Sequence, residues 1–143
     1  MKTFTKLPLF LILLLALLNV FFVSCEKTEP DHRDDFIGTY TVEEYSITRG
    51  RMSVFQSRII IDSQNPDEIL IRNFYGVGID VSAVVMGSKI FIPDQQVSFF
   101  EITRGQGSLN IDETILLEYY VTTRLPNSEP VTDFLEATYI PQF

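Results

Sequence analysis

Acidic residues on predicted strands are the side chains of this sequence best suited to hydrolytic chemistry. Glu43, Glu44 and Glu118 lie in segments where apolar and polar residues alternate, and each could point into a barrel or away from it. Glycosidases need two carboxylates across a cleft, about 5 to 9.5 Å apart. One hypothesis is therefore a hydrolase in which Glu44 and Glu118 converge. Acids on strands more often form the solvated face, so we favour a non-catalytic protein.

Residue types for other catalytic or metal chemistry are scarce. Nucleophilic catalysis relies on an activating base, usually histidine, and the only histidine, His32, precedes the first predicted strand. The sequence has no Gly-x-Ser-x-Gly motif, no His/Cys cluster and no Asp-rich calcium loop. Gly105-Gln106-Gly107 is followed by neither a lysine nor a helix, so it is not a phosphate-binding loop. We predict no enzyme activity, no metal site and no cofactor.

Length and charge bound the remaining functions. The chain has 143 residues, with 19 Asp and Glu against 11 Lys and Arg and a formal net charge of -8. An acidic chain without a basic stretch argues against a nucleic-acid partner, because affinity for phosphate backbones depends on clustered Lys and Arg. About 120 residues remain after a short leader, which is enough for one domain with a single core.

Residues 1–24 have the pattern of an export signal peptide. Lys2 and Lys6 form a short positive start, and residues 9–23 are apolar except for Asn19. This run is shorter than the roughly 20 apolar residues that a membrane-spanning helix needs. It ends at a small residue, Ser24. These features together are typical of a secretory signal.

The only cysteine, Cys25, follows this leader directly. Phe22-Val23-Ser24-Cys25 resembles the lipobox of bacterial lipoproteins, with Phe where Leu is usual. The resemblance implies that Cys25 begins the mature protein and carries acyl chains such as palmitate, which attach it to the outer membrane. Two or three chains make such an anchor durable. The alternative is an ordinary signal peptide followed by a free cysteine.

Residues 25–35 are predicted to be a disordered acidic tether. After Cys25 they are polar or charged apart from Pro30, so they have no apolar surface to bury. Acids close to Cys25 also resemble the surface-export signal of some Gram-negative lipoproteins, which implies display on the cell surface. The alternative is that the acids only keep the tether solvated, so both surface and periplasmic exposure stay open.

The remainder, residues 36–143, has the pattern of an all-β domain. Segments rich in Val, Ile, Phe, Tyr and Thr alternate with turn formers, as short strands require. The predicted strands are 36–43, 54–62, 69–75, 77–85, 88–92, 97–102, 108–111, 114–123 and 131–140. Residues 104–107 are predicted to be a turn. The short connections predict an antiparallel meander of about eight strands, closed into a barrel or folded into a sandwich.

Phe36-Ile37-Gly38-Thr39-Tyr40 resembles the Phe-x-Gly-x-Trp opening of lipocalins and fatty-acid-binding proteins, with Tyr40 in place of Trp. The resemblance implies a lipocalin-like (calycin-like) barrel in which this aromatic ring plugs one end. Several small bacterial lipoproteins of unassigned function are similar in layout. The alternative is an immunoglobulin-like β-sandwich, in which Tyr119 or Tyr120 would serve as a corner tyrosine.

Adjacent aromatic residues are the remaining functional signal. Phe74-Tyr75, Phe99-Phe100 and Tyr119-Tyr120 place neighbouring rings on opposite faces of strands. An open barrel interior would hold one small apolar ligand. Outward rings such as Phe100 or Tyr120 would instead contact a protein or glycan. We therefore predict a non-catalytic, lipid-anchored envelope protein that binds a small apolar ligand or a partner.

Overall fold

The computed structural model describes residues 30–143. The predicted signal peptide, the predicted lipid attachment at Cys25 and residues 26–29 of the predicted tether lie outside the described residues. Residues 31–143 form one compact unit. No helix in this described part is long and apolar enough to span a membrane.

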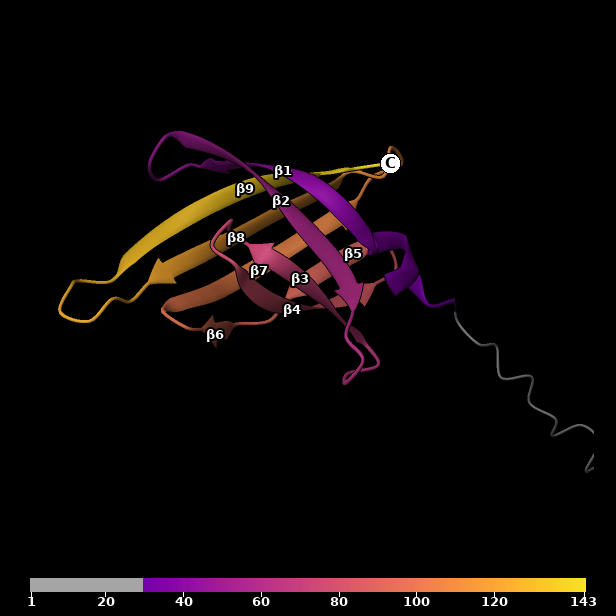
Figure 1. Cartoon of the computed structure of the whole chain (residues 1–143), viewed down its shortest axis with the longest axis horizontal. Coiled ribbons are helices and arrows are strands. Elements are labelled where there is room, and N and C mark those ends of the chain that lie inside the picture. The colour runs from indigo at the N-terminus through magenta and orange to yellow at the C-terminus, as the bar shows by residue number, and fades with distance from the viewer. Residues whose placement is uncertain (1–29) are drawn as a thin grey trace, which may run out of the picture. The chain divides into compact units, whose positions relative to one another are not determined.

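Eight antiparallel strands close into a barrel, and a ninth short strand lies beside one of them (Figure 1). The barrel strands are β1 (Gly38–Ser46), β2 (Arg51–Ile61), β3 (Glu68–Phe74), β4 (Ile79–Met86), β5 (Lys89–Ile92), β7 (Phe100–Leu109), β8 (Ile115–Thr123) and β9 (Val131–Pro141). Each pairs with the next along the chain, β9 pairs with β1, and β5 pairs with β7. The predicted all-β meander barrel is confirmed, and the alternative sandwich is wrong.

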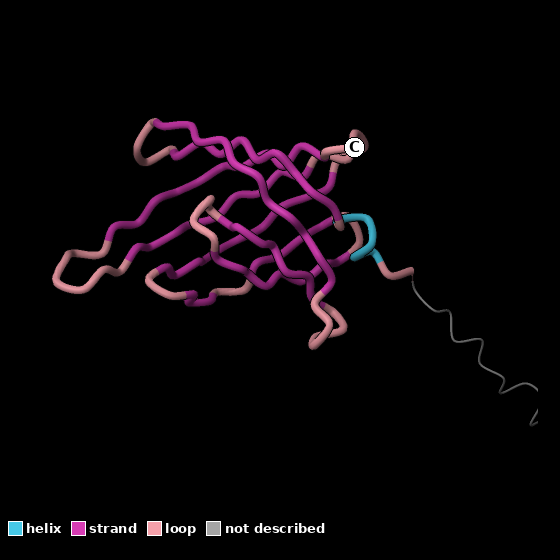
Figure 2. Tube along the Cα trace, viewed as in Figure 1, coloured by secondary structure: helices cyan, strands magenta, loops and turns pink. Residues whose placement is uncertain are grey.

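One end of the barrel is covered by a short 3-10 helix, η1 (His32–Phe36), which is the cyan segment in Figure 2. The Phe36 ring is fully buried, and the Tyr40 hydroxyl donates a 2.7 Å hydrogen bond to the Phe36 carbonyl oxygen. We call this the closed end and the opposite end, where β1 and β8 finish, the mouth. Residues 31–35, predicted to be part of the disordered tether, belong to the folded unit, in which η1 places the Phe36 ring in the core.

Residues 104–107 were predicted to be a turn, and this prediction is wrong: they lie within β7. Arg104 takes a left-handed conformation with φ 55°, and the register of β7 against β8 shifts between Thr103 and Gln106. A side chain at Gly105 would clash with Ile92 of β5, and one at Gly107 would clash with the Leu116 carbonyl oxygen. The glycines therefore permit a bulge and a close approach between strands rather than a turn.

The seam between β4 and β7 is closed in two different ways. In the closed half, β5 pairs with β4 on one side and with β7 on the other. Towards the mouth the short strand β6 (Gln95–Val97) pairs with β7. There the side-chain amide of Gln95 accepts a hydrogen bond from the Ser82 N–H of β4 at 3.1 Å and donates one to the Ser82 carbonyl at 2.8 Å. One side chain thus substitutes for a backbone ladder at the mouth.

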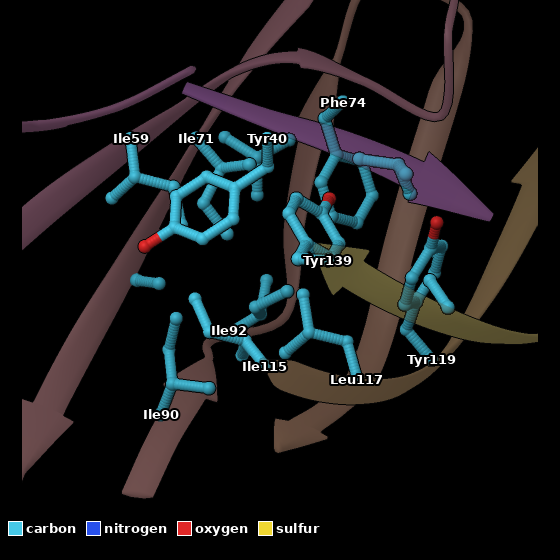
Figure 3. Packing of buried hydrophobic residues seen from close by; sticks show 14 of the residues in the cluster. Tyr40, Ile59, Ile71, Phe74, Ile90, Ile92, Ile115, Leu117, Tyr119 and Tyr139 are labelled. Carbon is cyan, nitrogen blue, oxygen red and sulfur yellow. The ribbon is translucent and has the colours of Figure 1, made fainter. Parts of the chain in front are cut away.

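The core occupies the closed half and the middle of the barrel. Inward positions alternate with exposed ones, as in β8, where Ile115, Leu117, Tyr119 and Val121 are buried. Figure 3 shows the rings of Tyr40 and Tyr139 among isoleucine side chains from several strands. The ring of Phe74 lies 4.5 Å from that of Tyr119. This part of the interior is filled by side chains.

Candidate functional site

A cavity of about 620 Å³ opens at the barrel mouth. We call it the mouth cup. Its lining residues are Glu44, Ser46, Arg49, Arg51, Met52, Ser53, Tyr75, Val77, Phe100, Thr123, Leu125, Ser128, Glu129, Val131, Asp133 and Leu135. They come from the mouth ends of β1, β2, β7, β8 and β9 and from the loops between strands. The volume lies within the usual range for small-molecule sites.

Glu44 is a buried carboxylate in this lining, with 2% of its surface exposed. The Tyr119 hydroxyl donates to its Oε2, and the Ser53 hydroxyl donates to its Oε1 at 3.5 Å. In Figure 3 the Tyr119 hydroxyl points away from the apolar side chains towards β1. Burial raises the pKa of Glu44, the two hydrogen bonds oppose this shift, and nearby Asp133 adds to it.

Asp133 is a second buried carboxylate, with 1% of its surface exposed. It accepts a 2.5 Å hydrogen bond from the Ser46 hydroxyl and a 3.4 Å one from the Tyr75 hydroxyl. The Arg49 guanidinium lies 3.3 Å from its Oδ2. The backbone N–H of Arg49 donates to the Ser46 hydroxyl at 3.0 Å. Asp133 therefore has both a cationic partner and hydrogen bonds, which a buried charge requires.

Aromatic and aliphatic side chains complete the cup. The rings of Tyr75 and Phe100 meet edge to face with their centroids 5.9 Å apart, and burial raises the pKa of Tyr75. Leu135 is buried, whereas Met52 at the rim is 64% exposed. The cup therefore combines an apolar wall with buried polar groups.

Below the cup, the Tyr139 hydroxyl is buried and has no hydrogen-bond partner within residues 30–143. Burial and the nearby Glu44 carboxylate raise the pKa of Tyr139. Tyr139 thus places a second buried hydroxyl near Glu44.

The structure separates the acids that the hydrolase hypothesis needed to bring together. Glu44 faces the interior, whereas Glu43 and Glu118 are exposed on the outside of β1 and β8. Because Glu44 and Glu118 lie on opposite sides of the barrel wall, they do not form the predicted pair across a cleft. Within residues 30–143, no three or more His, Cys, Asp and Glu side chains group so as to hold a metal ion.

The two aromatic residues predicted to face outward have different positions. Phe100 is half-buried and lines the cup, so its predicted outward position is wrong. Tyr120 does lie on the outside, where its ring stacks on Phe134 with centroids 4.7 Å apart. The Arg104 guanidinium lies 5.7 Å from the centre of the Tyr120 ring. Neighbouring side chains thus cover part of Tyr120.

Sequence reasoning named Tyr75 only as one of several paired aromatic residues, and it missed Asp133 and Ser46. A signal for Asp133 was present, because it shares the inward parity of Leu135 and Ala137 and breaks an otherwise apolar face. Its pairing with Ser46 joins residues 87 positions apart, so it becomes visible only once the barrel is closed.

No protein family matches this sequence, and no curated protein is detectably similar to it.

Proposed function

We propose that this protein is a non-catalytic, lipid-anchored envelope protein that binds a small amphipathic molecule in the mouth cup. The observation that carries the binding proposal is the cup itself: about 620 Å³ of space lined by both apolar and buried polar groups. Specific small-molecule sites combine an apolar wall with a few placed polar groups in this way.

The filled half of the barrel restricts the ligand. A long acyl chain would need the space occupied by Tyr40, Tyr119 and Tyr139, which are at most 3% exposed. We therefore replace the predicted apolar ligand with a shorter molecule that carries a polar group. Such a ligand would occupy the mouth and leave the core undisturbed.

A plugging variant tests the binding proposal. Native mass spectrometry of the full-length protein, expressed with its leader and purified from membranes, should detect a bound small molecule. Ser53→Trp, which fills the cup from an exposed position on β2, should remove that molecule. Ser63→Trp, at an exposed position in the closed-end loop, is the matched control. Loss of the molecule from both variants, or its absence from wild type, would contradict the proposal.

The location rests on the leader and the lipobox resemblance at Cys25. Radiolabelled palmitate should be incorporated into the wild-type protein and not into Cys25→Ser. Protease added to intact cells should then degrade the barrel if it is displayed on the surface. An uncleaved leader on the finished protein would contradict the lipoprotein assignment.

A second candidate function is contact with a partner protein or glycan. The outer stack of Tyr120 and Phe134, with Arg104 beside it, supports this candidate, because aromatic rings and arginine are enriched at binding hot spots. Crosslinking in membranes should capture a partner that Tyr120→Ala loses and that Ser53→Trp retains.

A further inference from the structure

The charges around the mouth cup are unequally paired. Among the described residues, Arg49 is the basic side chain that reaches Asp133, and neither a lysine nor an arginine pairs with Glu44. Arg51 lines the exposed rim without forming an ion pair to Glu44, and Glu129 adds a further acid there. The cup therefore holds three carboxylates and two guanidinium groups, and of its two buried acids Glu44 is the one without a cation.

A buried carboxylate without a cationic partner loses hydration that hydrogen bonds from neutral groups replace only in part. Tyr119 and Ser53 supply the hydrogen bonds to Glu44. The raised pKa of Glu44 has burial as its largest cause and is consistent with this deficit. A cation entering the cup would restore the missing charge partner.

The cup walls suit the rest of such a molecule. The edge-to-face pair of Tyr75 and Phe100 offers aromatic surface, and Leu135 and Val131 add aliphatic surface. Aromatic faces also attract organic cations. An anionic ligand would instead meet Glu44 and Asp133, two buried acids of like charge.

We propose that the mouth cup selects an organic cation, in which a primary ammonium group pairs with Glu44 and an apolar body lies against Tyr75, Phe100 and Leu135. This inference rests on the proposed small-molecule function and specifies its ligand class. Because Arg49 already pairs with Asp133, Glu44 is the carboxylate that would bind the ammonium group.

Three water-soluble probes with one body and different head groups test the selection: 4-phenylbutylamine, 4-phenylbutan-1-ol and 4-phenylbutanoate. Ligand-observed NMR on the detergent-solubilised mature protein should show the tightest binding for the amine. The alcohol should bind about tenfold more weakly and the carboxylate more weakly still. This comparison uses wild-type protein and does not depend on any variant.

Glu44→Gln keeps the shape of the side chain and removes its charge. It should weaken amine binding by about tenfold to a hundredfold, the range for a charged hydrogen bond, and leave alcohol binding within about twofold. Glu43→Gln, on the outer face of the same strand, is the control and should bind all three probes as wild type does. Retained alcohol binding also reports that Glu44→Gln is folded.

The outcomes separate the two proposals. If the three probes bind equally, or if Glu44→Gln leaves amine binding unchanged, the ligand class is wrong and the small-molecule cup remains supported. Tighter binding of the carboxylate would likewise overturn only the cationic class. If none of the probes binds and no molecule copurifies with the protein, both proposals fail.

Discussion

The two halves of this barrel use the same strands for different purposes. Inward positions in the closed half are mostly apolar or aromatic, as with Phe36 and Ile115, which are fully buried. Inward positions at the mouth include Glu44 and Asp133. Strand β9 passes through both halves, with Asp133 at one end and Tyr139 towards the other. The alternation of apolar and polar residues therefore forms the barrel strands, whereas polar residues at inward positions form the mouth cup.

The largest expected effect is the loss of the closed-end plug. Phe36→Ala should lower the free energy of unfolding by about 3–5 kcal/mol, because it leaves a cavity beneath η1. Phe100→Ala removes the same ring from the half-buried cup wall and should cost about 1 kcal/mol. Urea unfolding followed by circular dichroism measures both values. Equal costs would show that the two halves contribute alike to stability.

The next effect concerns the close approach of β7 to β8 in the closed half. Gly107→Ala should destabilise the fold by about 1–3 kcal/mol, because the new methyl group would clash with the Leu116 carbonyl oxygen and lie 2.5 Å from a Leu117 methyl carbon. Gly38→Ala is the matched control, since its added methyl group would lie 3.4 Å from the nearest atom of the Tyr40 ring, an ordinary contact distance. It should change stability by less than about 0.5 kcal/mol. Similar melting temperatures for the two variants would contradict the close-approach role of Gly107.

The seam at the mouth should be weaker. Gln95→Ala removes both hydrogen bonds to Ser82 and should cost about 1 kcal/mol. Gln96→Ala, at an exposed position of β6, should be nearly neutral. Amide hydrogen exchange should accelerate at the mouth end of β4 in Gln95→Ala and stay slow at Ile90, whose seam is a backbone ladder. Acceleration at both positions would mean that the seam opens as one unit.

The sequence predicted the barrel because alternation persists along long strands such as β8 and β9. It failed at Gly105 and Gly107, because glycine permits both a turn and a close strand approach, and only the positions of Ile92 and Leu116 on neighbouring strands decide between them. It identified Glu44 as a candidate acid but could not orient it. The contact between Ser46 and Asp133 depends on the closed order of strands, which no local pattern encodes.

The smallest net effect concerns pH, because one buried carboxylate from each half acts in an opposite direction. Asp62, beside the closed end, has its pKa lowered by the Gln64 N–H and then by the Asn65 side chain, both at 2.8 Å. Glu44, at the mouth, has its pKa raised by burial. The Asp62 contribution is complete above the usual aspartate value of about 3.9 and is lost as the pH falls through its lowered pKa.

Glu44 has the opposite sign, because the folded state binds its proton more tightly than the unfolded chain does. Its ionisation therefore reduces stability as the pH rises from the usual glutamate value of about 4.3 through the raised pKa. Urea unfolding from pH 3 to 8 measures the free energy of unfolding for both variants. Glu44→Gln should remove the fall in stability above about pH 4.3, and Asp62→Asn should remove part of the rise in stability at lower pH. Asp31, with a pKa near 2, and Asp112, whose pKa is lowered by Thr114, supply part of the acid-side gain that remains.

The exposed neighbours Glu43→Gln and Asp67→Asn are the controls for this measurement, and both should keep the wild-type profile. If Glu44→Gln instead lost stability uniformly at every pH, the contribution of Glu44 would come from its hydrogen bonds with Tyr119 and Ser53 rather than from its charge. That result would mean that the polar groups of the mouth stabilise the fold, as the apolar core of the closed half does. If Glu44→Gln is instead more stable than wild type only above the usual glutamate pKa, the charge of Glu44 lowers the stability of the mouth. Functional sites commonly reduce stability in this way.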